Sequence, residues 1–223
     1  MVKDGPFVFD ELGKKQKKHV QKALERCEVR RINPTEYRSQ IWEVTYAAYR
    51  GYENADNELS KESFDAELRT TEDEYWGAFC KDNGRLAGWM SCENGGDRTE
   101  TKKAKYHPEL QKEYRPSDAL HYAVLSHYLN ELHYSYVFSG TRNINHKTNV
   151  QDYKIDHWKF RKAYCYLHVE YRSWFGWAIT MLYPFRKVFQ LFDNNTKLHQ
   201  LNSLLLMEKI SRECRRRQRK KFT

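Results

Sequence analysis

The sequence predicts an α/β (α+β) domain, a mixed and twisted sheet flanked by helices, with a helical arm at its C-terminal end. Long helices with an apolar face alternate with short strands, which favours a mixed fold over an all-helical one. Asn83-Gly84 lies between two apolar runs, a strong signal for a β-hairpin. A strand, loop, helix and strand over residues 134–171 would then close the sheet.

Periodicity and capping residues predict the N-terminal elements. A basic helix over Leu12–Cys27 should lead into a short strand, Val29–Ile32. Asn33-Pro34 is expected to cap and open a helix that ends near Tyr49. Ser60 should cap the helix that follows.

The remaining elements of the domain are expected to form the sheet and the helix that covers it. Gly88 in the second hairpin strand suggests a bulge or a close backbone approach. The broad apolar surface of Ala119–Leu132 predicts a helix buried against the sheet. A polar loop is expected over residues 94–100. The expected strands are Tyr75–Cys80, Leu86–Cys92, Lys102–Leu110, Tyr134–Phe138 and Ala163–Tyr171.

The organisation divides into three parts: residues 1–32 form a basic entry helix and strand, residues 33–172 the main domain, and residues 173–223 an aromatic amphipathic helical arm with a polybasic tail. The net charge of +9 is concentrated at the two ends. Residues 14–31 carry eight basic and two acidic side chains, and residues 209–221 carry eight basic and one acidic. Such surfaces attract phosphate polymers, anionic lipids or anionic substrates, although a solvated helix face is an equally good reading of each run.

The five cysteines are scattered, without CxxC or metal-ligand spacing, which fits free thiols in a reducing compartment and predicts no metal site. No signal-peptide pattern and no apolar run of spanning length is found, so a cytoplasmic location is expected.

The stretch from Gly140 to Tyr164 holds the most concentrated polar chemistry of the chain. Polar groups at the end of a strand often line a binding crevice. His146 could accept a proton near neutral pH, beside Asn149, although a structural or incidentally exposed histidine is the commoner case for such a residue. Arg142 could clamp a carboxylate or phosphate. Further candidate substrate contacts are His107, Gln151 and Asp152.

This stretch resembles the GNAT superfamily of acyl-CoA-dependent N-acyltransferases and the related Fem-type aminoacyltransferases. Asn149, Tyr153 and Phe160 in "NVQDYKIDHWKFRKAY" match the spacing of the family's N…A…Y…GF helix. The runs "RNINHKTNVQD" and "FRKAY" are similar to GNAT-like proteins of bacterial surface-polysaccharide clusters. The resemblance implies transfer of an acyl group to an amine of a sugar or cell-envelope precursor. The alternative is a non-catalytic GNAT-like module that recognises a glycan, a protein or a membrane surface.

Two acyl donors follow from the resemblance. The family's phosphate loop has the form Q/R-x-x-G-x-G/A, but the matching run Leu110–Ala119 has no glycine. For acyl-CoA, Lys112 and Arg115 would have to hold the pyrophosphate. Fem-type enzymes lack this loop because their donor is aminoacyl-tRNA, which is the alternative donor and would make tRNA a partner.

The arm suggests a second kind of partner. Aromatic residues with interspersed cations over residues 174–192 are typical of an interfacial helix, and residues 215–221 add a polybasic end. Peripheral contact with the inner face of the cytoplasmic membrane is one expectation. Packing on the sheet or a homodimer contact is the other.

Overall fold

The computed structural model describes residues 1–51, 59–140, 149–192 and 196–221. The chain forms two compact units. The first, called the sheet unit, comprises Met1–Gly140 with Asp152–Lys162. The second, called the arm unit, comprises Thr141–Gln151 with Ala163–Thr223.

The sheet unit contains a six-stranded mixed sheet in the order β1-β6-β5-β4-β3-β2. Neighbouring strands are antiparallel except for β5 and β6, which are parallel. The strands are β1 (Val2–Asp4), β2 (Cys27–Ile32), β3 (Glu74–Cys80), β4 (Leu86–Asn94), β5 (Arg98–Tyr106) and β6 (Tyr136–Phe138).

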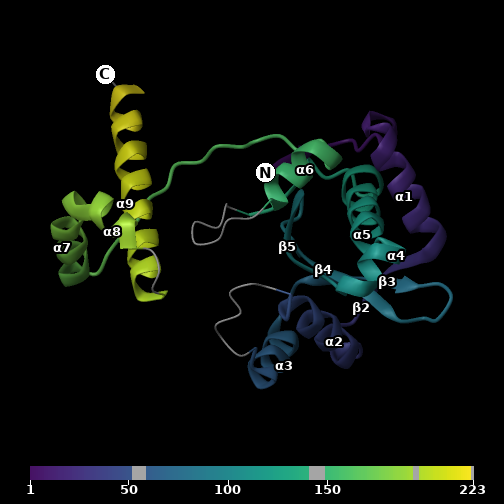
Figure 1. Cartoon of the computed structure of the whole chain (residues 1–223). Helices are drawn as coiled ribbons and strands as arrows, with labels where there is room; N and C mark the ends of the chain where they lie inside the picture. Colours follow the sequence, from purple (N-terminus) through teal and green to yellow (C-terminus); the bar gives the residue numbers. More distant parts are fainter. Residues whose placement is uncertain (52–58, 141–148, 193–195, 222–223) are drawn as a thin grey trace. The chain divides into compact units, whose positions relative to one another are not determined.

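Helices cover both faces of this sheet (Figure 1). One face packs against α2 (Arg38–Tyr49) and α3 (Lys61–Thr70), with Trp89 in that apolar cluster. The other face packs against α1 (Lys14–Arg26), α5 (Pro116–Leu125) and α6 (Val150–Trp158). A short helix, α4 (Pro108–Tyr114), joins β5 to α5, and a π-helix over Ser126–Glu131 continues α5. The expected mixed sheet flanked by helices is therefore confirmed.

The hairpin of β3 and β4 confirms the Asn83-Gly84 signal. Gly84 has a φ of 68°, which a side chain would oppose, and the Arg85 N–H donates to the Asn83 side chain at 2.9 Å. The register shifts where Ala78 pairs with Gly88, as a bulge requires. A β-carbon on Gly88 would lie 2.8 Å from the Tyr106 ring, so the close approach expected there is also confirmed.

Three expected elements are wrong, each for a local reason. The run Ala163–Tyr171 forms no strand; instead Arg161 makes an isolated bridge to Val2, and β1 pairs with β6. The helix expected from Asn33 begins at Arg38. The Asn33 side chain accepts hydrogen bonds from the N–H and hydroxyl of Thr35, a local turn that competes with the helix.

The polar loop expected over residues 94–100 is also wrong in its extent. The loop is only three residues long, because β4 continues to Asn94 and β5 already begins at Arg98. The turn is closed by a hydrogen bond from the Gly95 N–H to the Arg98 carbonyl. β5 therefore begins and ends earlier than the expected strand Lys102–Leu110. It ends at Tyr106, and the next residue, His107, is the N-cap of α4.

The arm unit is helical in its described part. α7 (Ser173–Leu182), a 3₁₀ turn (Tyr183–Phe185), α8 (Arg186–Phe189) and a second 3₁₀ turn (Gln190–Phe192) pack against the long α9 (Thr196–Lys221). Ile179 and Leu205 are its buried apolar side chains. In the parts of the chain that the structure describes, none of the helices combines the length and apolar character needed to cross a bilayer.

Candidate functional site

The parallel strands β5 and β6 are paired over three residues of each, which is the whole length of β6. The last pair is Glu100 with Phe138, so the rest of β5 has no β6 partner. Beyond Glu100, the ladder between β5 and β4 skips one residue: Ser91 pairs with Lys103 and Cys92 with Thr101. Lys102 is therefore a bulged residue just beyond the end of the β5–β6 pairing. Bulges are over-represented next to active sites because they redirect backbone groups.

Thr101 connects three elements at the end of this pairing. Its hydroxyl donates to the carbonyl oxygen of Phe138 at the end of β6, at 3.2 Å. The hydroxyl oxygen of Thr101 in turn accepts a hydrogen bond from Lys154 Nζ of α6 at 3.0 Å. The lysine side chain therefore reaches the point where the pairing of β5 with β6 ends.

Lys154 is a buried lysine whose charge is poorly solvated. Its exposed fraction is 6%, and burial lowers its pKa to about 8 even though Cys92 and Glu100 act in the opposite direction. Its ammonium group lies 5.3 Å from the centre of the Phe160 ring. A lysine with a pKa near neutrality can exchange a proton at physiological pH, a property common to functional lysines.

Glycine is required beside Glu100. Gly140 has a φ of 42°, and a β-carbon there would lie 2.8 Å from Oε1 of Glu100. The chain can therefore pass close to the Glu100 carboxylate only because residue 140 has no side chain. The end of the β5–β6 pairing thus combines the Glu100 carboxylate, the buried amine of Lys154 and the bulge at Lys102.

His121 of α5 is the second buried base of the unit. Its Nδ1 lies 2.7 Å from the carbonyl oxygen of Ser117, and only Nδ1–H can donate to that acceptor. Nε2 is buried without a hydrogen-bond partner among the described residues. Burial, followed by repulsion from Lys154, lowers the pKa to about 4, so the imidazole is neutral at pH 7. The ring stacks on Trp158.

The first turn of α5 already has internal partners for its backbone N–H groups. The Ser117 N–H donates to the Gln111 side chain at 3.2 Å, and those of Asp118 and Ala119 donate to the Arg115 carbonyl at 3.0 and 3.3 Å. A helix N-terminus binds phosphate through such N–H groups when they are free. These three are engaged, so this turn does not fit the pyrophosphate of a coenzyme A.

The Asp118 carboxylate makes the same turn unfavourable for an anion. It is fully buried and accepts hydrogen bonds from Gln16 Nε2 and Arg115 Nε, each at 2.7 Å, and from the Tyr153 hydroxyl at 3.0 Å. Arg115 also contacts Nδ1 of His19 at 2.8 Å. Arg115 is thus engaged in contacts within the fold, and a phosphate bound at this turn would lie near the negative charge of Asp118.

The structure places the expected site residues in different surroundings. His107 is the N-cap residue of α4, and its buried Nδ1 has no hydrogen-bond partner within the described part of the chain. Lys112 is exposed on α4. Asn149 and Asp152 are exposed at the start of α6, and Gln151 between them is half-buried. Arg142 and His146 lie outside the described residues.

Sequence reasoning missed the residues that meet where the β5–β6 pairing ends. Lys154 and Trp158 are four positions apart on α6 and both are buried, so they share one helix face. That spacing was the available signal for Lys154. Glu100 carried no comparable signal because it lies in the stretch expected as loop, and Thr101 lies between that loop and the strand expected from Lys102.

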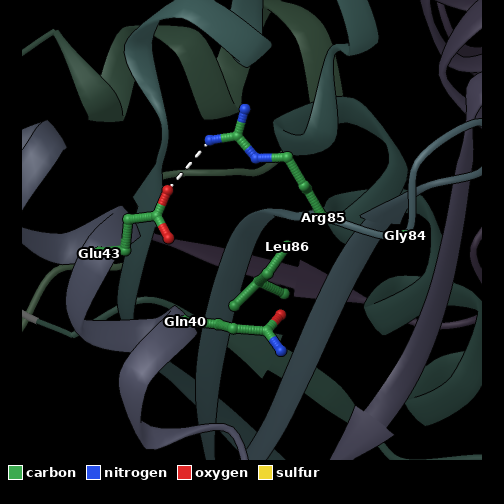
Figure 2. Close-up of a pocket in the computed structure, with 5 residues that line it drawn as sticks. All are labelled: Gln40, Glu43, Gly84, Arg85 and Leu86. Carbon is green, nitrogen blue, oxygen red and sulfur yellow. Dashed lines mark hydrogen bonds and ion pairs between the residues drawn. The ribbon is translucent and has the colours of Figure 1, made fainter.

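A separate hollow lies at the other end of the hairpin (Figure 2). It has a volume of about 180 Å³ and is lined by Gln40, Glu43, Gly84, Arg85 and Leu86. Its exposed Arg85–Glu43 ion pair spans 3.0 Å. None of these five residues belongs to the group around Thr101 and Lys154. Among the residues that the structure describes, no group of His, Cys, Asp and Glu is placed to hold a metal ion.

Comparison with known proteins finds no matching family model and no match among curated proteins. Among solved structures, the crystal structure of FemX matches with a TM-score of 0.52 at 9% identity over 71% of this chain. The chain spans 57% of the length of FemX. The fold of the matched part is therefore similar to that of FemX.

Two smaller proteins match with lower scores. One is a ribosomal-protein-alanine N-acetyltransferase from Brucella melitensis biovar Abortus 2308, with a TM-score of 0.46 and 10% identity over 66% of this chain and 99% of that protein. The other is an aminoglycoside N-acetyltransferase in complex with CoA, with a TM-score of 0.46 and 10% identity over 66% of this chain and 95% of that protein.

Proposed function

We propose that the chain is an N-acyltransferase and that the acyl group is transferred where the pairing of β5 with β6 ends. The observation that carries this proposal is the buried Lys154, bound to Thr101 at that point. A lysine costs free energy to bury, so its position at the end of a strand pairing calls for a function. The GNAT-like fold, together with the sequence resemblance, supports acyl transfer as that function.

In the proposed step, the neutral Lys154 acts as the general base. The acceptor amine attacks the acyl carbonyl carbon, forming the new C–N bond, and its proton passes to Lys154 Nζ. The bond from the carbonyl carbon to the donor's leaving group then breaks, and that group takes up the proton. A base with a pKa of about 8 suits this task, because proton transfer is most efficient near the working pH.

The negative charge that develops on the carbonyl oxygen needs a hydrogen-bond donor. We assign this role to the backbone N–H of Lys102, since the bulge removes that residue from the regular ladder with β4. Its side chain is engaged elsewhere, in ion pairs with Asp73 at 3.3 Å and Glu93 at 2.9 Å. The neutral His121 is a positioning residue that packs on Trp158 behind α6.

The donor we favour is an aminoacyl-tRNA. The first turn of α5 does not fit a pyrophosphate, because its N–H groups and the Asp118 carboxylate are engaged internally. A polyanion instead finds an exposed basic face on α1, formed by Lys14, Lys15, Lys18 and Lys22. The acceptor that the sequence resemblance suggests is the amine of an amino sugar or of a cell-envelope precursor.

A donor screen tests this proposal. The full chain is titrated by calorimetry with acetyl-CoA, with a longer acyl-CoA and with alanyl-tRNA, at 0.05 and 0.2 M salt. The tRNA should bind, and its affinity should fall steeply with salt because binding releases counterions. Product formation is then followed by mass spectrometry with glucosamine and a UDP-linked amino sugar as acceptors.

Matched variants make the screen specific to the site. Lys154→Met should abolish product formation while leaving donor affinity unchanged. Lys18→Met, at an exposed lysine of α1, should weaken tRNA binding and retain the chemical step. Binding of acetyl-CoA with transfer of its acetyl group would overturn the assignment of the donor. If none of the three donors binds, the chain is a non-catalytic GNAT-like module.

A further inference from the structure

The arm unit presents an unusual row of exposed apolar side chains, here called the aromatic stripe. It consists of Trp174, Trp177, Met181, Phe185, Val188 and Leu191, whose exposed fractions run from 53% to 78%. Soluble proteins seldom expose large apolar patches without a partner for them. The two tryptophans, at 68% and 69%, are the largest members.

The stripe runs through α7, α8 and the 3₁₀ turn that follows each of them. Its members are three or four positions apart in sequence, and within α7 this spacing places Trp174, Trp177 and Met181 on one side of the helix. Other side chains of the unit are used for internal packing. Ile179 of α7 is 2% exposed, and Leu205 of α9 is 1% exposed. Tyr183 lies under two guanidinium groups, 4.5 Å from Arg186 and 3.9 Å from Arg212. α7, α8 and α9 are thus fixed against one another, with the stripe left outside.

The charge of the arm unit indicates what the stripe would meet. Residues 163–221 carry twelve basic and four acidic side chains, which accounts for nearly all of the chain's net charge of +9. Arg215, Arg216 and Arg217 are exposed on α9, and Lys187 is exposed on α8 beside Val188. Apolar rings with a surplus of cations are complementary to the surface of an anionic bilayer.

We propose that the aromatic stripe is a membrane-docking surface that inserts its side chains into the interface of an anionic lipid bilayer. Tryptophan is enriched at the headgroup level of membranes, where its ring is apolar and its N–H finds a partner. The cations hold the unit against the negative surface, and the stripe supplies the apolar contact. This proposal is independent of the acyl-transfer step, because every residue in it belongs to the arm unit.

Vesicle binding tests the proposal with the full chain. Vesicles of phosphatidylcholine with about a third phosphatidylglycerol are compared with pure phosphatidylcholine by co-sedimentation. Strong binding is expected only to the anionic vesicles, and it should weaken as salt rises from 0.1 to 1 M, since the Debye length falls from about 10 Å to about 3 Å. Brominated lipids should quench the wild-type tryptophan fluorescence, a readout that needs no variant.

Three variants separate the contributions. Changing Trp174, Trp177 and Phe185 together to Ser should lower the partition coefficient about tenfold or more. Changing Arg215–Arg217 to Gln should lower it by a similar factor on anionic vesicles only. The matched control changes Val8 and Tyr46 of the sheet unit to Ser; these are also exposed apolar residues, at 40% and 46%, and binding should not change.

Several outcomes would overturn the proposal. Wild-type protein that stays in the supernatant at low salt, or fluorescence that brominated lipids do not quench, would do so. Equal binding of the stripe variant and the wild type would do so as well, provided that circular dichroism shows both folded. A dimer in analytical ultracentrifugation that the stripe variant abolishes, together with no vesicle binding, would assign the stripe to a second copy of the chain.

Discussion

Replacing Lys154 by Met should make the protein more stable and less active at the same time. The fall in the lysine pKa from its usual 10.5 to about 8 corresponds to roughly 3 kcal/mol of lost stability at neutral pH. Methionine removes that cost but also removes the hydrogen bond to Thr101 and the contact with Phe160, worth about 1 kcal/mol. A net gain of about 2 kcal/mol in unfolding free energy is expected at pH 7.

The gain should depend on pH in a defined direction. Below pH 8 the lysine is protonated in both states, so the full cost of the buried charge is present in the wild type. Between pH 8 and 10.5 only the unfolded state stays protonated, and the wild type regains stability as pH rises. The difference between variant and wild type should therefore shrink above pH 8 and reverse by pH 10.5, where only the lost contacts remain.

Urea unfolding at pH 7, 8.5 and 10, followed by circular dichroism, measures this difference. Comparing variant and wild type at each pH cancels the titration of other groups. The exposed Lys18→Met should change stability by less than about 0.5 kcal/mol at every pH. A Lys154→Met protein that is less stable than the wild type at pH 7, or a difference that does not vary with pH, would show that the ammonium group is well solvated and would refute the reasoning.

Four further outcomes follow from the site and the sheet. The kcat/KM should rise with pH and level off above about 8, because the neutral lysine is the base; a bell centred below pH 6 would exclude Lys154 from that role. Gly140→Ala should lower the unfolding free energy by about 1–2 kcal/mol in urea, since φ is 42° and its β-carbon would lie 2.8 Å from a carboxylate oxygen. Asp118→Asn should cost about 2 kcal/mol, because Arg115 loses its buried charge partner, and calorimetry should still find no CoA binding. Gly88→Ala should cost about 2 kcal/mol by overpacking against a ring 2.8 Å away, which thermal unfolding would report.

Local features were predictable from the sequence, because each depends on residues close together in the chain. Asn83-Gly84 defined the hairpin since only a glycine readily adopts the required positive φ. Ser60 was recognisable as a cap, and its hydroxyl accepts from the Ser63 N–H at 3.2 Å. The apolar surface of Ala119–Leu132 predicted burial, although the last turns are wound as a π-helix.

The closing strand could not be predicted, because strand pairing is a property of the partner as well as of the segment. Residues 163–167 are apolar or aromatic and residues 167–171 alternate apolar and polar side chains, a pattern that favours a strand. The edge of the sheet is instead taken by β1, a short segment whose pairing with β6 has no local signal. Residues 162–172 belong to no helix or strand, and Tyr164 is 91% exposed.

The site was only partly predictable for a related reason. The sequence predicted a helix in this region and indicated its polar side chains as candidate site residues. Lys154 looks solvated in sequence and becomes chemically distinctive only once β5, β6 and Phe160 surround it. A pKa is set by tertiary surroundings, so a sequence contains no direct record of it.

The pairing of β1 with β6 also bears on how the chain folds during synthesis. Val2 pairs with Phe138 and with Arg161, so the strand that completes the sheet leaves the ribosome long before its partners do. Until then β1 has no edge to join, and nascent chains can begin to fold before they are complete. Pairings between distant residues are also slow to form. We therefore expect β2–β5 and their helices to assemble first, with the sheet edge completed only after residue 161 has emerged, a sequence of events that ribosome-stalled chains of increasing length would reveal.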